Sequence, residues 1–391
     1  MLNFEFHTPT KIYFGVGVHK DIGEIIASYG FKKILLHYGM GSIKKSGLYD
    51  DITNSLKKQS IEFAELGGVQ PNPKVSLVRQ GAAICKKEKP DMILAVGGGS
   101  VIDSAKVIAI SALTDIDAWD FSAKRQTPTD ALPIGVVLTI SASGSEMSTS
   151  AVITDEQQKL KRGFNSQLNR PLFSVLNPEL TYSVGRFQTG CGIVDIMMHT
   201  LERYFSKNKD NDLSDRISEA LLKSVIKAGE VALNNPTDYQ ARATLMWAGS
   251  LSHNDLMGVG RDYFFSCHQM EHELSGMYDH VAHAAGLSVL FPAWAKYVYK
   301  HSPDIFCQYA TRVWNIDMNF QEPLETALKG IITTENYFKA IGMPTRLNQL
   351  NITDEKFEEM ANKCTYLGKR TLPSYIPLGE KEIIEILKLC E

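Results

Sequence analysis

Alternation between short apolar runs and helix-like stretches is the feature of this chain that most restricts its fold. The apolar runs, each four to six residues long, are 11–14, 33–37, 61–66, 92–96 and 134–138. The stretches with helical periodicity that lie between them are 20–29, 47–58, 75–87 and 100–112. Such alternation predicts a parallel sheet covered by helices on both faces. The run 92–96 is continuously apolar, as expected of a strand that is buried on both faces.

The second half of the chain has a different pattern, because strand-like runs disappear after about residue 184. Helical periodicity continues in 216–233, 239–252, 284–299, 303–313, 323–341, 354–363 and 380–389. A chain of 391 residues is long enough for two domains. We therefore predict an α/β domain over residues 1–184 and an all-α domain over residues 185–391.

A run of three glycines follows the central apolar stretch. Gly97, Gly98, Gly99 and Ser100 lead directly into a predicted helix. Glycines allow close approach of a ligand to the backbone, and the helix N-terminus attracts anions, so we predict a site for a pyrophosphate group. The loop does not have the G-x-G-x-x-G spacing, and a tight turn that merely requires glycine is the alternative interpretation. Asp103, one turn into the helix, either faces the ligand or is exposed.

The segment after the second apolar run indicates which nicotinamide cofactor binds. No Asp or Glu occurs between Lys33 and Tyr49, where an acidic residue would read a ribose 2′-hydroxyl. Gly39 and Ser42 leave room there, and Lys44 and Lys45 supply positive charge. This pattern favours NADP(H) over NAD(H). The alternative is that both lysines are solvated residues at the start of a helix.

Six of the ten histidines lie between residues 191 and 286. Asp195 precedes His199 by four residues and His268 precedes His272 by four, so each pair shares one helix face. His283 follows. One carboxylate with two or three imidazoles suits Fe(II) or Zn(II). The alternative is that each histidine is solvated or hydrogen-bonded on its own. By its spacing alone, Glu202 is a candidate acceptor that would orient one of the imidazoles.

Composition excludes several other classes of protein. Forty-one basic and 44 acidic residues give a net charge of −3 without a basic block, so we expect no nucleic-acid partner. No apolar run approaches the length of a membrane span. Six scattered cysteines fit free thiols in a reducing compartment, and we predict a cytoplasmic protein.

Over nearly its whole length the chain resembles the iron-containing (group III) alcohol dehydrogenases, most closely their NADPH-dependent butanol dehydrogenase and aldehyde reductase branch. The motifs that carry the resemblance are Gly-Val-Gln-Pro-Asn-Pro at 68–73, Gly-Gly-Gly-Ser-Val-Ile-Asp-Ser-Ala-Lys at 97–106, Thr-Ile-Ser-Ala-Ser-Gly-Ser-Glu-Met at 139–147, Asn-Pro-Glu-Leu-Thr at 177–181, Gly-Ile-Val-Asp-Ile-Met-Met-His-Thr-Leu-Glu at 192–202 and His-Gln-Met-Glu-His-Glu-Leu-Ser-Gly at 268–276.

The resemblance implies a dehydroquinate synthase-like architecture, a homodimer and a role for each residue that matches a family motif. The implied metal ligands are Asp195, His199, His268 and His283. His272 would lie beside the nicotinamide without binding the metal. The implied cofactor contacts are Gly97, Gly98, Gly99 and Ser100 at the pyrophosphate, Gly39 and Ser42 at the 2′-phosphate, and Thr139 and Lys161 elsewhere. His283 lies one residue farther from His272 than is usual in that family, so His280 is a rival for the last ligand position.

These patterns together predict a metal-dependent dehydrogenase that transfers hydride between NADP(H) and short-to-medium primary alcohols or aldehydes. Two alternatives stay open: a metal- and NAD-dependent lyase of the dehydroquinate synthase type, and a metal or nucleotide sensor without turnover. A lyase acting on a phosphorylated polyacid needs several basic residues near its metal. Only Arg203 and Arg261 are close to the candidate ligands in sequence, which argues against it.

Overall fold

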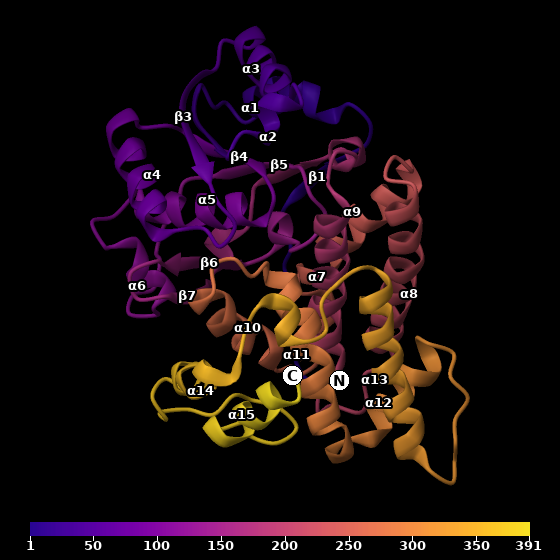
Figure 1. Cartoon of the computed structure of the whole chain (residues 1–391). Coiled ribbons are helices and arrows are strands. Elements are labelled where there is room, and N and C mark those ends of the chain that lie inside the picture. Colours follow the sequence, from indigo (N-terminus) through magenta and orange to yellow (C-terminus); the bar gives the residue numbers. More distant parts are fainter. The chain divides into compact units, whose positions relative to one another are not determined.

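The computed structural model describes residues 1–391, and these form two compact units (Figure 1). The sheet unit comprises His7–Val184 and Thr237–Ser250. The helical unit comprises Met1–Phe6, Gly185–Pro236 and Leu251–Glu391. The predicted fold class, an α/β part with a parallel sheet and an all-α part, is confirmed.

The sheet unit is built on six parallel strands in the order β1-β8-β5-β4-β2-β3. Their bounds are β1 (Lys11–Phe14), β2 (Lys33–Gly39), β3 (Glu62–Val69), β4 (Met92–Gly97), β5 (Ile134–Leu138) and β8 (Phe173–Leu176). All five predicted strands are present. The sequence analysis did not predict β8, which has only four residues, or the antiparallel hairpin of β6 (Ser150–Asp155) and β7 (Leu160–Asn165).

Helices cover both faces of this sheet, as the apolar pattern predicted. The first face carries α1 (Ile22–Ser28), α2 (Ser42–Lys45) and α3 (Leu48–Lys58), and the second carries α4 (Val75–Glu88), α5 (Gly99–Ser111) and α6 (Ala118–Ser122) (Figure 1). Side chains alternate along each strand. Leu94 and Val96 of β4 therefore enter the core of the first face, whereas Ile93 and Ala95 enter that of the second. This double burial explains why β4 is apolar throughout.

Helix α9 (Tyr239–His253) belongs mostly to the sheet unit, whereas the sequence analysis placed it in the domain 185–391. Met246 is fully buried in the core of the second sheet face. The ring of Trp247 meets Phe14 edge-on at a centroid distance of 6.5 Å. The Ser250 hydroxyl donates to Glu146 Oε1 at 2.6 Å. Helical periodicity does not reveal which core receives a helix, so this assignment needed the tertiary contacts.

The helical unit has no strand, in agreement with the prediction for the second half. Its helices are α7 (Arg186–Tyr204), α8 (Asp212–Asn234), α10 (Ser266–Met277), α11 (His283–Val298), α12 (Pro303–Arg312), α13 (Pro323–Ala340), α14 (Phe357–Cys364) and α15 (Glu380–Lys388). Every residue of α7 from Thr189 to Tyr204 is buried, and this helix packs against α8 and α11. A helix buried on all sides brings any polar residue that it carries into the core. None of the helices is both long and apolar enough to cross a membrane.

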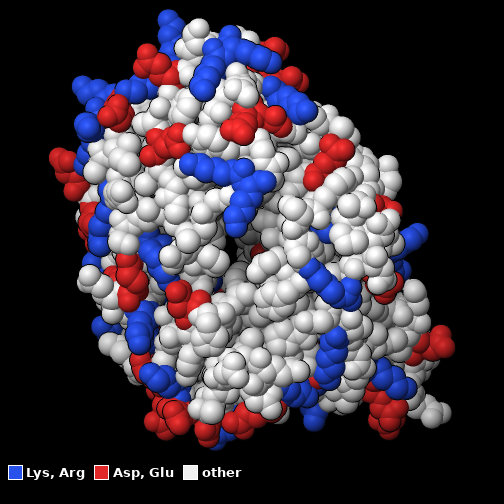
Figure 2. All heavy atoms as spheres, turned by 45° about the horizontal axis from the view of Figure 1, so that its top comes forward, with Lys and Arg blue, Asp and Glu red and all other residues white.

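Acidic and basic side chains are interspersed on the face of the molecule seen in Figure 2. All six cysteines are free and buried. This confirms the expectation of free thiols. Burial raises the pKa of the Cys85, Cys191 and Cys390 thiols to about 12.

Candidate active site

Four predicted metal ligands converge on one point inside the helical unit. Asp195 and His199 lie one turn apart on the buried helix α7, and Asp195 Oδ1 is 3.8 Å from His199 Nδ1. The same oxygen is 4.0 Å from Nε2 of His268, in the first turn of α10. It is 3.9 Å from Nε2 of His283, the first residue of α11. Three helices thus bring one carboxylate and three imidazoles together.

The chemistry of this donor set fits a divalent cation. Tetrahedral ligands with bonds of about 2.1 Å lie about 3.4 Å apart, slightly closer than the 3.8 to 4.0 Å between Asp195 Oδ1 and the three imidazole nitrogens. His199 Nδ1 and His268 Nε2 are buried and have no hydrogen-bond partner in the protein, which is rare for buried ring nitrogens. Burial lowers the pKa of His199 well below its usual range, which favours the neutral imidazole that metals bind.

Two buried glutamates orient the imidazoles from behind. Nδ1 of His268 contacts Glu202 Oε2, and Nδ1 of His283 contacts Glu271 Oε2. Glu202 also accepts from the backbone N–H groups of Cys267 at 2.6 Å and His268 at 3.2 Å. Such carboxylate–imidazole pairs fix the ring orientation and leave the other nitrogen free to bind a metal. The predicted role of Glu202 is confirmed.

Glu271 was missed by the sequence analysis, although the chain contains a signal for it. Gly286 lies one turn into α11, and a Cβ added there would be 2.8 Å from Glu271 Cγ. This glycine lets Glu271 of α10 approach α11 closely enough to reach His283.

The remaining histidines of this region differ in position. His280 is exposed, and its Nε2 lies 3.0 Å from the carbonyl oxygen of Leu350, so the structure places His283 rather than His280 beside Asp195. His272 is half-buried, with its ring centroid 5.7 Å from that of His283. The ring of His253 lies 4.0 Å from that of His199.

The predicted cofactor residues lie in the sheet unit, most of them at or just after the carboxyl ends of three adjacent strands. Strand β4 pairs with β2 through Val96 and Tyr38, and with β5 through Gly97 and Leu138. Gly39, Gly97 and Thr139 therefore stand at the same edge of the sheet, where ligands of such open sheets bind. The N–H of Thr139 donates to the carbonyl oxygen of Gly97 at 3.1 Å.

Packing explains why three consecutive glycines open helix α5. A Cβ at Gly97 would lie 2.5 Å from Val101 Cγ2, one at Gly98 would lie 2.3 Å from Ile140 Cγ2, and one at Gly99 would lie 2.3 Å from Ser143 Oγ. The glycines are thus required by the turn itself. No side chain caps the first turn of α5, whose leading N–H groups have no acceptor within the helix. A tight turn that requires glycine and a site for a pyrophosphate group, the two interpretations of this loop, are therefore compatible.

Asp103 is half-buried, and both of its carboxylate oxygens are hydrogen-bonded within the sheet unit. Its Oδ1 accepts from Ser145 Oγ at 2.5 Å, and its Oδ2 accepts from the backbone N–H of Val152 at 3.0 Å. The residue ties α5 to the hairpin. Lys161 on β7 is buried, and its Nζ donates to Asn72 Oδ1 at 3.0 Å.

The ribose end of the predicted cofactor site contains a carboxylate that the sequence argument overlooked. Ser42 begins α2 and Lys45 ends it, and both are exposed. Lys44 lies between them, with its Nζ 3.9 Å from Glu65 Oε2. Glu65 is on β3, which pairs with β2 through Leu36. An acidic residue therefore reaches this end of the sheet from the neighbouring strand.

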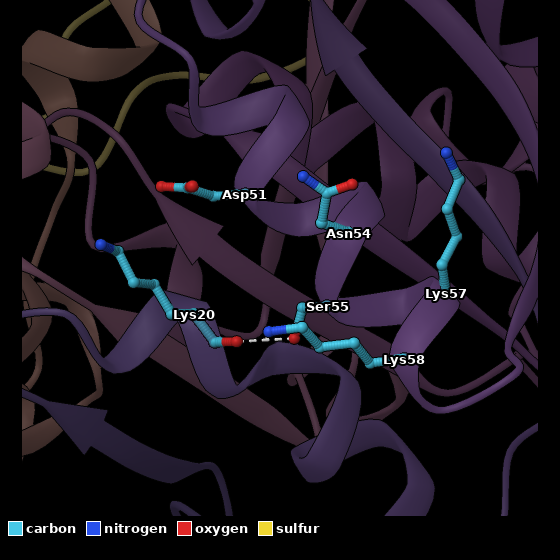
Figure 3. A pocket seen from close by; sticks show the side chains of 6 residues that line it. All are labelled: Lys20, Asp51, Asn54, Ser55, Lys57 and Lys58. Atoms are coloured by element: carbon cyan, nitrogen blue, oxygen red, sulfur yellow. Dashed lines mark hydrogen bonds between the residues drawn. The ribbon is translucent and has the colours of Figure 1, made fainter.

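A pocket of about 570 Å³ lies elsewhere on the sheet unit (Figure 3). Its lining residues are Lys20, Asp51, Asn54, Ser55, Lys57 and Lys58. The Ser55 hydroxyl donates to the carbonyl oxygen of Lys20 at 2.6 Å. All of the lining residues except Ser55 are exposed, and none is a predicted site residue, so this groove does not correspond to the candidate active site.

Comparison with known proteins agrees with this geometry. The family model for iron-containing alcohol dehydrogenases matches residues 9–178, and the model for the C-terminal part of that family matches residues 189–390. The chain is 42% identical to NADH-dependent butanol dehydrogenase A of Clostridium acetobutylicum over 99% of both chains. It is 35% identical to the NADPH-dependent aldehyde reductase YqhD of Escherichia coli over 95% of both.

Among solved structures, the NADH-dependent butanol dehydrogenase A of Thermotoga maritima superposes with a TM-score of 0.96 at 40% identity, covering 100% of this chain and 99% of that one. Both halves of the chain thus match one family. The protein belongs to the iron-containing alcohol dehydrogenase family.

Proposed function

We propose that this protein is a metal-dependent alcohol dehydrogenase and aldehyde reductase that uses NADP(H) and short-to-medium primary alcohols or aldehydes. The hydride moves from C4 of the nicotinamide to the carbonyl carbon, and a proton adds to the carbonyl oxygen. The products are a primary alcohol and NADP⁺. The observation that carries this proposal is that one ring nitrogen each of His199, His268 and His283 lies within 4.0 Å of Asp195 Oδ1.

The residues of the chain have distinct tasks in this proposal. Asp195 and the three imidazoles would hold Fe(II) or Zn(II), with Glu202 and Glu271 fixing His268 and His283. When bound, such a cation supplies a Lewis acid that stabilises negative charge developing on the substrate oxygen. His272 carries a titratable imidazole next to His283 and would relay the final proton.

The cofactor would be held by the edge of the sheet. Gly97, Gly98, Gly99 and Ser100 would bind the pyrophosphate through backbone N–H groups at the start of α5, and Thr139 lies beside them. Lys161 would contribute from the hairpin. At the ribose, Gly39, Ser42 and Lys45 support a preference for NADP(H). The relatives differ here, since the butanol dehydrogenases are named as NADH-dependent and the aldehyde reductase as NADPH-dependent.

We also propose that the protein is a homodimer in the cytoplasm. Strand β1 is at one end of the sheet and pairs only with β8, so its other edge offers unpaired backbone groups. Phe14 and Val16 are 39% and 62% exposed there. A second copy would cover these groups in a symmetric contact. Free cysteines support a reducing compartment.

The lyase alternative has little support, because both nearby arginines are engaged within the protein. Arg203 Nη1 donates to the carbonyl oxygen of His199 at 2.7 Å. Arg261 Nη1 donates to the carbonyl oxygens of Arg203 and Tyr204, and its Nη2 is 2.8 Å from Asp215 Oδ1. Neither guanidinium is free to bind a phosphorylated polyacid. The sensor alternative has no observation that favours it over a dehydrogenase.

A steady-state assay tests the proposed function. Protein loaded with Fe(II) or Zn(II) should oxidise NADPH in the presence of butanal, and a chelator should abolish the reaction. The Asp195→Asn variant should lose activity and metal together. Failure to oxidise either NADPH or NADH with any short aldehyde, despite a full complement of metal, would refute the proposal.

A further inference from the structure

A cluster at the end of β2, formed by Tyr38, Lys44, Tyr49 and Glu65, has been given no role so far in the proposed function. These residues come from β2, α2, α3 and β3, so folding alone brings them together. They lie in the sheet unit, beside Gly39, Ser42 and Lys45. The cluster therefore borders the position where the adenosine ribose of a dinucleotide is recognised in such folds.

Glu65 is the centre of this cluster. Its Oε2 accepts from the Tyr38 hydroxyl at 2.8 Å, and its Oε1 accepts from the Tyr49 hydroxyl. Gly67 makes room for the arrangement, because a Cβ there would lie 2.5 Å from Cε2 of Tyr38. The ring of Tyr38 thus lies over Gly67 of β3, and its hydroxyl is directed toward Glu65, which precedes Gly67 by two residues on the same strand. Both hydrogen bonds hold the carboxylate in place.

Lys44 is held by the same cluster although its side chain is 51% exposed. Its Nζ lies 4.6 Å from the ring centre of Tyr49, 5.1 Å from that of Tyr38 and 3.9 Å from Glu65 Oε2. Two aromatic faces and a carboxylate each attract an ammonium group. Neighbouring Lys45 has no such restraint and is exposed. The two lysines that the sequence offered for a 2′-phosphate are therefore not equivalent.

We propose that Glu65 determines the cofactor specificity of this enzyme by holding Lys44 on the two tyrosine rings and away from a ribose 2′-phosphate. This inference rests on the proposed dehydrogenase function and deepens it. Glu65 thereby limits the preference for NADP(H), because only Lys45 is left to pair with the negative charge of the 2′-phosphate. Freeing Lys44 should strengthen that preference.

Binding of cofactor fragments tests this proposal without turnover. Isothermal titration calorimetry of the metal-loaded protein with adenosine 2′,5′-bisphosphate and with 5′-AMP gives the ratio of the two affinities. Glu65→Gln removes the charge and keeps the shape of the side chain; its amide oxygen can still accept from one tyrosine hydroxyl, and its amide N–H can donate to the oxygen of the other. It should shift the ratio toward the bisphosphate by about fivefold at low salt, as expected for one partly screened charge. An unchanged ratio would overturn the proposal.

Two further variants separate the effect on Lys44 from the change in net charge. Glu62→Gln removes an exposed charge from the start of the same strand and should leave the ratio unchanged. Adding Lys44→Met to Glu65→Gln should cancel the gain, and a gain that persists would contradict the mechanism. In the otherwise unaltered chain, Lys44→Met should change the ratio less than twofold. A larger loss would mean that Lys44 already contacts the phosphate.

The outcome also distinguishes this inference from the proposed function. If the protein reduces butanal but the ratio is unaffected by Glu65→Gln, only the inference fails. If neither fragment binds and no cofactor is oxidised, the dehydrogenase assignment fails, and the inference fails with it.

Discussion

Two glutamates that are not among the predicted ligands orient two of the candidate metal-binding imidazoles. Glu202 contacts Nδ1 of His268 and accepts two backbone N–H groups at the start of α10. Glu271 has the corresponding contact with His283. Each glutamate therefore selects the tautomer that presents Nε2 toward Asp195.

The first prediction concerns Glu202. Glu202→Gln should weaken metal binding by about 10- to 100-fold, the usual effect of losing a carboxylate behind a metal-bound imidazole. Competition with a fluorescent chelator measures this affinity. Glu146→Gln removes a buried carboxylate from the sheet unit and serves as the control. Equal metal affinity in the two variants would show that Glu202 does not act through His268.

The second prediction concerns His37, a fully buried histidine that the sequence analysis did not single out. Its Nδ1 lies 2.9 Å from the carbonyl oxygen of Leu66, and its Nε2 lies 3.0 Å from Ser104 Oγ. Burial lowers its pKa to about 4 from an ordinary value of 6.5. Between these pH values the unfolded chain binds a proton that the folded chain does not. The free energy of unfolding should therefore fall by roughly 3 kcal/mol as the pH drops through this window.

Urea denaturation between pH 7 and pH 4 measures that loss. Other groups also titrate in this range, so the comparison is with His37→Gln, which cannot gain the proton. The variant should be less stable at pH 7 but should lose less stability on acidification. Parallel pH profiles for the two proteins would contradict the assigned role of His37.

At the scale of secondary-structure elements, the turn between β4 and α5 combines close packing with a candidate anion site. Gly98 has φ −92° and ψ −169°, a conformation open to any residue, so its constraint is steric. Its missing Cβ leaves room for Ile140, in the segment after β5. Lys106, farther along α5, donates to Ser145 Oγ and to the carbonyl oxygen of Ser150. Helix α5 thus fixes both the turn and the segment that faces it.

The third prediction follows from this packing. Gly98→Ala should displace Ile140 and weaken dinucleotide binding by at least about tenfold, or about 1.4 kcal/mol. Adding Ile140→Ala should recover part of that affinity, because it removes the atom in conflict. Quenching of protein fluorescence by the cofactor measures the dinucleotide affinity of the single and the double variant. Gly185→Ala is the matched control, since a Cβ there meets nothing within 4 Å. A weakening that Ile140→Ala does not relieve would exclude the steric explanation.

At the scale of the whole molecule, the two units should respond to different ligands. The ligands for the cation come from α7, α10 and α11, which all belong to the helical unit. The predicted cofactor contacts all belong to the sheet unit. A ligand stabilises only the structure that binds it, and the stabilisation at 100 times Kd is about 2.7 kcal/mol.

The fourth prediction is that a chelator loosens the helical unit selectively. Hydrogen exchange followed by mass spectrometry should show faster exchange in α7, α10 and α11 after metal removal, while β2, β4 and β5 keep their protection. Adding back Fe(II) or Zn(II) should restore the slow exchange. Uniform acceleration through both units would mean that the metal does not bind at these helices.

The sequence by itself determined five of the strands, most of the long helices and the chemistry of the site. Strands β1 to β5 follow from local apolar patterns, and Asp195 and His199 share a face because four residues make about one helical turn. The three consecutive glycines before α5 indicate that the backbone there lies close to other atoms. These features depend on residues near one another in the chain, which is why they can be predicted.

Only the tertiary structure decided which distant residues meet. It groups His283 rather than His280 with Asp195, places Glu271 behind that imidazole, and packs most of α9 with the sheet. It also brings Glu65 to Lys44 from a neighbouring strand, although no acidic residue lies near Lys44 in that stretch of sequence. Contacts of this kind depend on how elements pack in space, and a single sequence has no periodicity that encodes them.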